Sequence, residues 1–314
     1  MNFTDTLLTL CANQPHIAEL LLSEAQTSLV AELGEDAPCE LLVASPQQGE
    51  PLRAYHSQRS RLSVREVDPF QLFTPQTRRY DVLFHQDGLH RFTRPQIQAL
   101  LAQQVAIARK VAFRVPTARF PANQSQFGER LLTMEQWRST LTPFDIEELR
   151  PVSENNEHLL CVLRGEPTAE PLLAQTQLPQ EPFPFGISAI VHTRNEARHI
   201  AECLQTLQGW TDEIIVCDME SEDDTVEIAR RFTDNILAYP RIENFDSARN
   251  ASAFEAKYRW VFYLDADERV PQPLGHALRQ LALTEGDNFE ALRIPFRTYF
   301  GGNWLKCLYP GYVA

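Results

Sequence analysis

Four short apolar runs between residues 187 and 264 alternate with segments of helical periodicity, and this alternation constrains the fold most. Runs that are apolar throughout, rather than at every second position, are typical of strands buried on both faces of a parallel sheet. Parallel strands need crossover connections, and the segments between these runs can supply them as helices. We therefore predict a β-α-β-α-β-α-β series. Its strands cover residues 187–191, 213–217, 235–239 and 260–264, and its helices begin near residue 200 and cover 225–232 and 246–258.

The first half of the chain also alternates between the two periodicities, which predicts a second α/β domain with a largely parallel sheet. Thr93 is a suitable N-cap for a helix with Pro95 in its first turn, and another helix is expected from Thr133. We expect the first strand at residues 40–44 and expect a second strand and helix to be missing before Asp68. The other predicted elements are a helix at 17–33 and strands at 80–84, 110–116 and 158–163.

A proline-rich stretch from Gly165 to Gly186 separates the two halves. Its five prolines remove backbone donors and favour extended conformations, so a regular element is not expected there. The length of 314 residues is about twice that of a usual domain. We predict domains at residues 1–164 and 187–314, joined by a semi-rigid linker at 165–186.

Composition excludes several classes of protein. The net charge of −13 argues against a nucleic-acid-binding surface, and no apolar stretch reaches the length of a transmembrane helix. The N-terminus lacks the basic and apolar regions of a signal peptide. Six scattered cysteines without a C-x-x-C pair are expected to be buried thiols in a reducing compartment. We expect a cytoplasmic protein, with peripheral association at the inner face of the membrane and homo-oligomer formation left open.

Acidic residues follow two of the predicted strands of the second half. Asp218 ends one strand, and Asp265 and Asp267 follow another. Ligands of open parallel sheets bind at the carboxyl ends of the strands, and residues two apart in an extended stretch point to one side. Two carboxylates give hard oxygen ligands to Mg²⁺ or Mn²⁺, which neutralises charge on a departing diphosphate. An isolated D-x-D usually marks a solvated turn. The prediction of a metal site therefore depends on the position of this D-x-D directly after a strand that is expected to be buried.

Four segments of the second half follow one another in a recognisable order. They are ISAIVHTRNEARHIAECLQTL, DEIIVCDMESEDDTVEIARRF, SARNASAFEAKYRWVFYLDADERV and RIPFRTYFGGNWLKCLYPG. In these segments, residues 187–312 resemble glycosyltransferase family 2, which has the GT-A fold, and most closely its lipopolysaccharide-core branch. The resemblance implies that Thr193, Asn195 and Glu196 line a nucleotide pocket. Its further implications are that Asp218 binds the base or ribose, that Arg249 lies near the phosphates, that Asp265 and Ala266 line the donor site, and that Asp265 and Asp267 hold the metal.

Two departures from the family pattern qualify this expectation. The family commonly has Asp-Ser-Gly-Ser-Thr-Asp-Gly-Thr after its second strand, whereas residues 218–225 here carry Glu220 and Asp224 in place of the glycines. We expect these acids to stiffen the loop. The family's general base is expected beyond Ala314, so the catalytic base remains unassigned and this chain is expected to bind a donor without transferring its sugar. Residues 299–312 are expected to lack part of their packing partner.

Three segments of the first half, YDVLFHQDGLHRF, KVAFRVPTARFP and RLLTMEQWRSTLTPF, carry a second resemblance. In these segments, the first half resembles class I methyltransferases that use S-adenosylmethionine. The resemblance implies a Rossmann-like domain, but those enzymes carry a glycine-rich turn after their first strand, and the turn expected here, at residues 45–50, has one glycine and a proline. We therefore expect a degenerate domain that does not bind S-adenosylmethionine.

Three other groups are weaker candidates. His85 and His90 flank Asp87, but their spacing suits no zinc pattern and favours a loop or surface role. His192 is expected to be a pocket-wall histidine with its hydrogen bonds satisfied. Ser221 has no nearby histidine, which argues against a nucleophile.

The leading hypothesis is a metal-dependent, inverting glycosyltransferase, or a donor-binding fragment of one. Its donor is a nucleotide-diphospho-sugar, with a UDP-sugar favoured, and its acceptor is a glycan or lipid-linked molecule of the bacterial cell surface. The alternatives are a non-catalytic protein that binds nucleotide-sugars and a methyltransferase that acts through the N-terminal domain.

Overall fold

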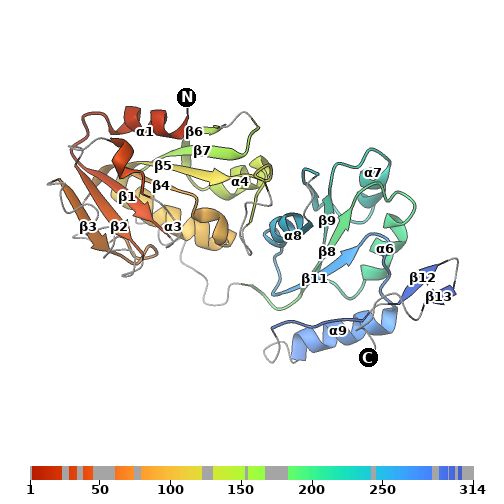
Figure 1. Cartoon of the computed structure of the whole chain (residues 1–314). Helices are drawn as coiled ribbons and strands as arrows, with labels where there is room; N and C mark the ends of the chain where they lie inside the picture. Colours follow the sequence, from red (N-terminus) through yellow and green to blue (C-terminus); the bar gives the residue numbers. More distant parts are fainter. Residues whose placement is uncertain are drawn as a thin grey trace.

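The computed structural model describes most of the chain as two α/β units (Figure 1). The residues that it describes are 2–22, 28–33, 38–44, 61–73, 79–121, 130–152, 155–166, 183–241, 245–284, 290–295, 297–300 and 303–305. Most of the predicted linker, residues 167–182, lies outside them. Within the described part, no helix is long and apolar enough to cross a membrane, and the five cysteines that it includes are buried free thiols.

The first half forms a seven-stranded sheet in the order β3-β2-β1-β4-β5-β7-β6, in which β7 runs antiparallel to both of its neighbours. Without β7, this is the 3-2-1-4-5-6 order of doubly wound Rossmann-like sheets, so the predicted fold class is confirmed. The strands are β1 (Ile17–Leu21), β2 (Cys39–Val43), β3 (Leu62–Glu66), β4 (Tyr80–Gln86), β5 (Ala108–Pro116), β6 (Asp145–Pro151) and β7 (His158–Arg164). The helices are α1 (Phe3–Cys11), η1 (Val30–Leu33), η2 (Leu89–Arg91), α3 (Arg94–Ile107) and α4 (Met134–Leu141).

The predicted helix at residues 17–33 is wrong. Residues 17–21 form β1, which lies between β2 and β4 and is buried along its whole length. A central parallel strand carries apolar residues on both faces, so its pattern does not alternate and a short run can be mistaken for a helix. The helix was predicted from Leu20, Leu21, Leu29 and Ala31, whose spacing is close to the helical period of about 3.6 residues, but Leu20 and Leu21 belong to the strand.

The prediction that a second strand is missing before Asp68 is also wrong. Residues 39–43 form the second strand of the sheet, and β3 pairs with it in parallel from Leu62. Any connection between these strands lies in residues 45–60, outside the described residues. The methyltransferase pattern requires glycines directly after the first strand, which is β1. The sequence that follows β1, residues 22–29, contains no glycine, so the chain departs from the pattern there and not at residues 45–50.

Glu19 is a buried carboxyl group whose hydrogen bonds hold the segment after β1. Its oxygens accept from the Ser28 hydroxyl at 2.6 Å and from the backbone N–H groups of Leu29 and Val30 at 2.7 and 3.2 Å. Burial raises the pKa of Glu19 to about 7, although these hydrogen bonds act in the opposite direction. The folded state therefore binds more protons than the unfolded state between the two pKa values.

We expect Glu19 to make the protein less stable as the pH rises. Its contribution is present below the unfolded-state pKa, near 4.5, and is lost as the pH passes about 7. Urea unfolding at pH 5, 6 and 7 measures this for the parent protein and for Glu19→Gln, which cannot ionise. The difference in unfolding free energy between the two should shrink as the pH rises. Parallel pH profiles would show that Glu19 does not titrate in this range.

The predicted surface role of His85 and His90 is wrong, because both are buried. His85 stacks on Phe113 with ring centroids 5.3 Å apart, and its Nε2 lies 3.1 Å from Oε1 of Gln104. Burial lowers the pKa of His85 to about 4, so the ring is neutral. Asp87 between them forms an ion pair with Arg114. The cluster is part of the packed interior at the end of β4.

The predicted helix starts of the first half are confirmed. Thr93 caps α3, and the Oε1 of Gln96 accepts from its backbone N–H at 2.9 Å. Thr133 caps α4 by accepting from the Gln136 N–H at 3.2 Å.

The second half forms a four-stranded parallel sheet in the order β10-β9-β8-β11, as the alternation predicts. The expectation that the strand before Asp265 is buried is wrong, because β11 lies at an edge of this sheet and Leu264 is its one buried residue. Helices α6, α7 and α9 pack on one face, and α8 contacts β8 and β9 on the other. The strands are β8 (Ile187–Thr193), β9 (Glu213–Asp218), β10 (Ile236–Ala238) and β11 (Trp260–Asp265). The helices are α6 (Ile200–Leu207), α7 (Thr225–Ala229), α8 (Phe245–Ala253) and α9 (Gln272–Thr284).

Beyond α9 the structure describes one short antiparallel pair, β12 (Thr298–Phe300) with β13 (Asn303–Leu305). The expectation that residues 299–312 lack a packing partner otherwise falls outside the described residues.

Candidate donor site at the strand ends

Three strands of the second sheet end beside one another, which brings together the residues predicted from separate parts of the sequence. In the parallel registers, Thr193 at the end of β8 is paired with Asp218 at the end of β9. On the other side of β8, His192 is paired with Asp265 at the end of β11. This carboxyl edge is where open parallel sheets bind their ligands.

Thr193 and Asp218 each present a polar atom that lacks a protein partner within the described part of the chain. The two residues are buried, with 2% and 6% of their surface exposed. Oγ1 of Thr193 and Oδ1 of Asp218 make no hydrogen bond to any described residue. The other carboxylate oxygen, Oδ2 of Asp218, accepts from the Ser221 N–H at 3.1 Å. A buried polar atom without a partner costs free energy, so this pair is chemically suited to a hydrogen-bonding ligand.

Asn195 holds the loop after β8 against the loop after β9. Its backbone has a left-handed φ of 55°, which asparagine tolerates better than most residues. The Asn195 N–H donates to the Ser221 hydroxyl at 2.9 Å, and its side-chain Oδ1 accepts from the Glu222 N–H at 2.8 Å. Asn195 is therefore engaged in shaping the two loops around Asp218.

Further hydrogen bonds join the same two loops. The backbone N–H groups of Glu196 and Ala197 donate to the Thr225 hydroxyl at 2.8 Å and to Oδ2 of Asp223 at 3.1 Å. Hydrogen bonds from Thr225 also lower the pKa of Asp223. Oε2 of Glu196 lies 2.8 Å from Nδ1 of His199 and accepts its hydrogen bond. The acidic loop is thus fixed at both of its ends.

Glu220 occupies a position of the acidic loop where the family commonly has glycine, and its backbone keeps a conformation that favours glycine. Its φ is 58°, and a residue with a Cβ pays about 1–2 kcal/mol for this region. Its side chain is exposed. The replacement therefore leaves a strained residue at the edge of the candidate site.

We expect Glu220→Gly to raise the free energy of unfolding by roughly 0.5–1 kcal/mol, since relief of strain exceeds the added entropy of the unfolded chain. Glu222→Gly is the matched control, because Glu222 is an exposed neighbour whose φ is not positive. That control should lower stability by about 0.5–1 kcal/mol. Urea titrations of the three proteins compare them. Equal losses in both variants would show that Glu220 is not strained.

Asp265 and Asp267 both lie at the surface, on either side of the buried Ala266. Desolvation raises the pKa of the Asp265 carboxyl, the positive charge of Arg249 opposes this, and the like charge of Asp267 adds to it. The two carboxylates are therefore close enough to repel each other. A divalent cation between them would relieve that repulsion.

The neighbours of the two aspartates shape the turn that carries them. The Ala266 N–H donates to the His192 carbonyl at 3.2 Å and ties the turn to β8. The Glu268 carboxylate accepts from the Asp265 N–H at 3.0 Å, so Glu268 holds the backbone of this turn.

Arg249 brings positive charge to this edge from α8. Its charge opposes the rise in the pKa of Asp265 that desolvation causes, and it adds to the fall in the pKa of His192, so it lies within electrostatic reach of the ends of β8 and β11. His192 is buried, and its Nε2 lies 3.0 Å from the Ser252 hydroxyl, also on α8. Burial and Arg249 together lower the pKa of His192 to about 4, so this histidine is neutral, as expected of a pocket wall.

The side chains at this edge could supply only some of the ligands that Mg²⁺ or Mn²⁺ requires. Among the described residues, no group of three or more His, Cys, Asp or Glu side chains is arranged to hold a metal ion. Asp265 and Asp267 supply carboxylate oxygens, and Mg²⁺ is commonly held by one or two carboxylates together with substrate phosphates and water. Asp265 and Asp267 therefore fit a cation whose coordination is completed by the oxygens of a diphosphate and by water.

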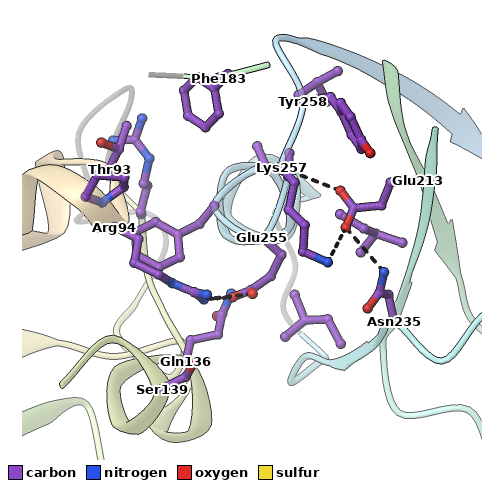
Figure 2. Close-up of a pocket in the computed structure, with 18 of the residues that line it drawn as sticks. Thr93, Arg94, Gln136, Ser139, Phe183, Glu213, Asn235, Glu255, Lys257 and Tyr258 are labelled. Carbon is purple, nitrogen blue, oxygen red and sulfur yellow. Dashed lines mark hydrogen bonds and ion pairs between the residues drawn. The ribbon is translucent and has the colours of Figure 1, made fainter. Parts of the chain in front are cut away.

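A pocket of about 650 Å³ lies between the two halves, at the opposite edge of the second sheet (Figure 2). It is lined by Glu213, where β9 begins, and by Asn235, just before β10. Two ion pairs lie among its lining residues, Lys257 with Glu213 at 2.9 Å and Arg94 with Glu255 at 2.7 Å. The pocket is thus separate from the strand ends that carry Asp218 and Asp265.

Sequence reasoning missed Tyr239 and Ser252, which contact the candidate site from behind. Tyr239 follows β10, and its N–H donates to the Asp218 carbonyl at 2.8 Å. Tyr239 stands in no motif, and the matching segment that contains Ser252 pointed only to Arg249 and to the D-x-D with its central alanine. The apolar run 235–239 predicts only that Tyr239 closes a strand, and the contacts of both residues depend on the tertiary fold.

Comparison with known proteins finds relatives of the second half of the chain. Residues 188–306 match the family model of glycosyl transferase family 2. An uncharacterised glycosyltransferase of Rickettsia prowazekii is 29% identical over 118 residues, covering 37% of this chain and 40% of the relative. A prophage-derived glycosyltransferase, SunS, of Bacillus subtilis is 39% identical over 75 residues, covering 23% and 18%. The chain therefore spans about two fifths or less of these relatives.

Solved structures similar to the chain include methyltransferases. The methyltransferase domain of a bacterial Hen1 matches with a TM-score of 0.43 and 13% identity, over 51% of this chain and 96% of that one. The N-methyltransferase NodS of Bradyrhizobium japonicum matches with a TM-score of 0.40 and 15% identity, over 52% and 85%.

Proposed function

We propose that this chain, which carries a glycosyl transferase family 2 domain at residues 188–306, is a glycosyltransferase whose second half binds a nucleotide-diphospho-sugar. The observation that carries the proposal is the pair of buried, unsatisfied oxygens of Thr193 and Asp218 beside the D-x-D carboxylates. A UDP-sugar is the favoured donor, and bacterial cell-surface glycan synthesis is the proposed setting.

Each side chain has a part in the proposed site. Oδ1 of Asp218 accepts a hydrogen bond from the base or ribose, and Thr193 bonds the nucleotide beside it. Asn195 and Glu196 hold the loops that line the pocket, and Arg249 stabilises the negative charge of the diphosphate. Asp265 and Asp267 would hold Mg²⁺ or Mn²⁺, which supplies charge stabilisation to the departing diphosphate when it is bound.

The transfer reaction proposed for this site inverts the configuration at the anomeric carbon of the sugar. A hydroxyl oxygen of a glycan or lipid-linked acceptor forms a bond to C1 of the sugar, and the bond from C1 to the diphosphate oxygen breaks. The nucleoside diphosphate leaves with the electron pair, and a general base takes the hydroxyl proton. No role in proton removal is assigned to Thr193, Asp218 or Arg249.

Isothermal titration calorimetry of the full chain with UDP, with and without Mn²⁺, tests the donor site. We expect saturable binding of UDP that Mn²⁺ strengthens. A parallel titration with S-adenosylmethionine tests the alternative that the first half is an active methyltransferase, and we expect no heat of binding there. Binding of S-adenosylmethionine without binding of UDP would reject the proposed function. A sugar-transfer assay then separates an enzyme from a protein that only binds nucleotide-sugars.

A further inference from the structure

The two halves of the chain share one apolar core, and it crosses from the first sheet to the rear of the candidate site. Trp137 and Leu141 of α4 belong to the same buried cluster as residues of the second half. Those residues of the second half lie at the ends of β9 and β10, on α8 and just after it, and they are Cys217, Met219, Tyr239, Ala248, Ala251 and Phe254. The first half therefore packs against the end of β9, where Cys217 and Met219 flank Asp218.

Tyr239 connects Asp218 to the first half through two hydrogen bonds. Its backbone N–H donates to the Asp218 carbonyl at 2.8 Å, and its hydroxyl donates to the Leu131 carbonyl at 2.9 Å. The side chain is only 1% exposed. A displacement of the segment that holds Leu131 would therefore be transmitted to the end of β9.

A second set of contacts fixes the end of α8. Arg94 donates to both carboxylate oxygens of Glu255 at 2.7 Å, and its guanidinium lies over the Phe254 ring at 5.1 Å (Figure 2). Nε2 of Gln136 donates to the Ala251 carbonyl at 2.9 Å and to Oε1 of Glu255 at 2.8 Å. These polar groups are all at least partly buried, so their geometry is restricted from both halves.

The helix held by these contacts is the one that carries the positive charge of the candidate site. Arg249 lies on α8, and Ser252 on the same helix contacts His192 at the end of β8. A binding group must be held to within about 0.5 Å by packed neighbours for its geometry to be productive. The contacts from the first half supply that packing for α8.

We propose that the first half of the chain acts as a positioning domain for the donor site, through Tyr239 behind Asp218 and through the Arg94–Glu255 pair at the end of α8. This inference rests on the proposed function, since it assigns the positions of Asp218 and Arg249 to donor binding. Tyr239, Arg94, Gln136 and Glu255 are positioning residues that do not touch the donor. The methyltransferase-like half would then serve sugar transfer without a cofactor of its own.

Charge reversal across the interface tests the proposal in the full chain. Glu255→Arg and Arg94→Glu should each weaken UDP–Mn²⁺ binding by roughly 2- to 30-fold, the usual range for coupling through packed networks. The double variant, Arg94→Glu with Glu255→Arg, should recover most of that affinity. Calorimetry is run at a temperature at which circular dichroism shows every variant to be folded. A residue with only a structural role would lower the melting temperature without changing the affinity of the folded protein.

Glu147→Arg is the matched control, because Glu147 pairs with Lys110 at 2.7 Å with comparable exposure but lies within the first sheet. It should leave UDP affinity unchanged. Tyr239→Phe provides a test with less risk to folding, because it removes only the hydroxyl that reaches Leu131, and it should weaken UDP binding by at least 2-fold.

The outcomes separate the positioning role from the proposed function. Parent-like affinity in folded Tyr239→Phe and in the folded charge-reversal variants would overturn the positioning role and leave the donor site standing. If the charge-reversal variants do not fold, Tyr239→Phe alone decides. A parent protein that does not bind UDP would overturn both proposals.

Discussion

Replacing Asp218 with alanine is expected to weaken UDP binding by about 10- to 100-fold, both with and without Mn²⁺. A hydrogen bond to a charged group contributes about 1.5–3 kcal/mol, and Oδ1 of Asp218 is a buried acceptor without a protein partner among the described residues. The effect should not depend on the metal, because the proposed partner of Asp218 is the base or ribose. Calorimetric titration of UDP in Mn²⁺ and in EDTA measures both affinities.

Two further variants sharpen this test. Asp218→Asn keeps the shape of the side chain and removes its charge, so it should also weaken binding but by less than alanine. Asp234→Asn is the control, because Asp234 is exposed and precedes β10 at the opposite edge of the sheet. Parent-like affinity in both Asp218 variants would remove Asp218 from the nucleotide pocket.

Replacing Asp267 with alanine should abolish the gain in UDP affinity that Mn²⁺ produces. Asp267 is exposed in the turn after β11, so the fold should remain cooperative and its melting temperature should change little. The variant should bind UDP equally in Mn²⁺ and in EDTA, because the cation loses one of its two proposed carboxylate ligands. Glu222→Gln is a suitable control, since it removes another exposed acid of the same edge. A full response to Mn²⁺ in Asp267→Ala would place the metal elsewhere.

The second sheet could be predicted from the sequence because its signals are local. Strands β8, β9 and β11 are continuous apolar runs, and each ends in polar residues that sequence order alone places at one edge of a parallel sheet. The proximity of Thr193, Asp218 and Asp265 follows from that topology and needs no knowledge of side-chain packing.

The first sheet was predicted less well, and the reason is physical. The central strand β1 is too short and too uniformly buried to show a period, and Glu19 inside it is tolerated only because the segment 28–30 supplies its hydrogen bonds. The polar ring of His85 is similarly tolerated in the core because it hydrogen-bonds with Gln104 and stacks on Phe113. Such compensations come from residues distant in sequence.

The contacts between the halves could not be predicted for the same reason. Tyr239 bonds Leu131 across 108 positions of sequence, and Arg94 bonds Glu255 across 161. Neither pair has a periodic or motif-like signal. The left-handed φ of Glu220 is likewise set by the two loops that Asn195 joins, although the family's glycine at that position indicates where to look.

A crystal structure of the full chain with UDP and Mn²⁺ tests the central claim most directly. The account predicts that the base or ribose lies within hydrogen-bonding distance of Oδ1 of Asp218, and that the anomalous signal of Mn²⁺ lies between the diphosphate and the carboxylates of Asp265 and Asp267. A nucleotide bound in the pocket of Glu213 and Asn235, or in the first half of the chain, would contradict it.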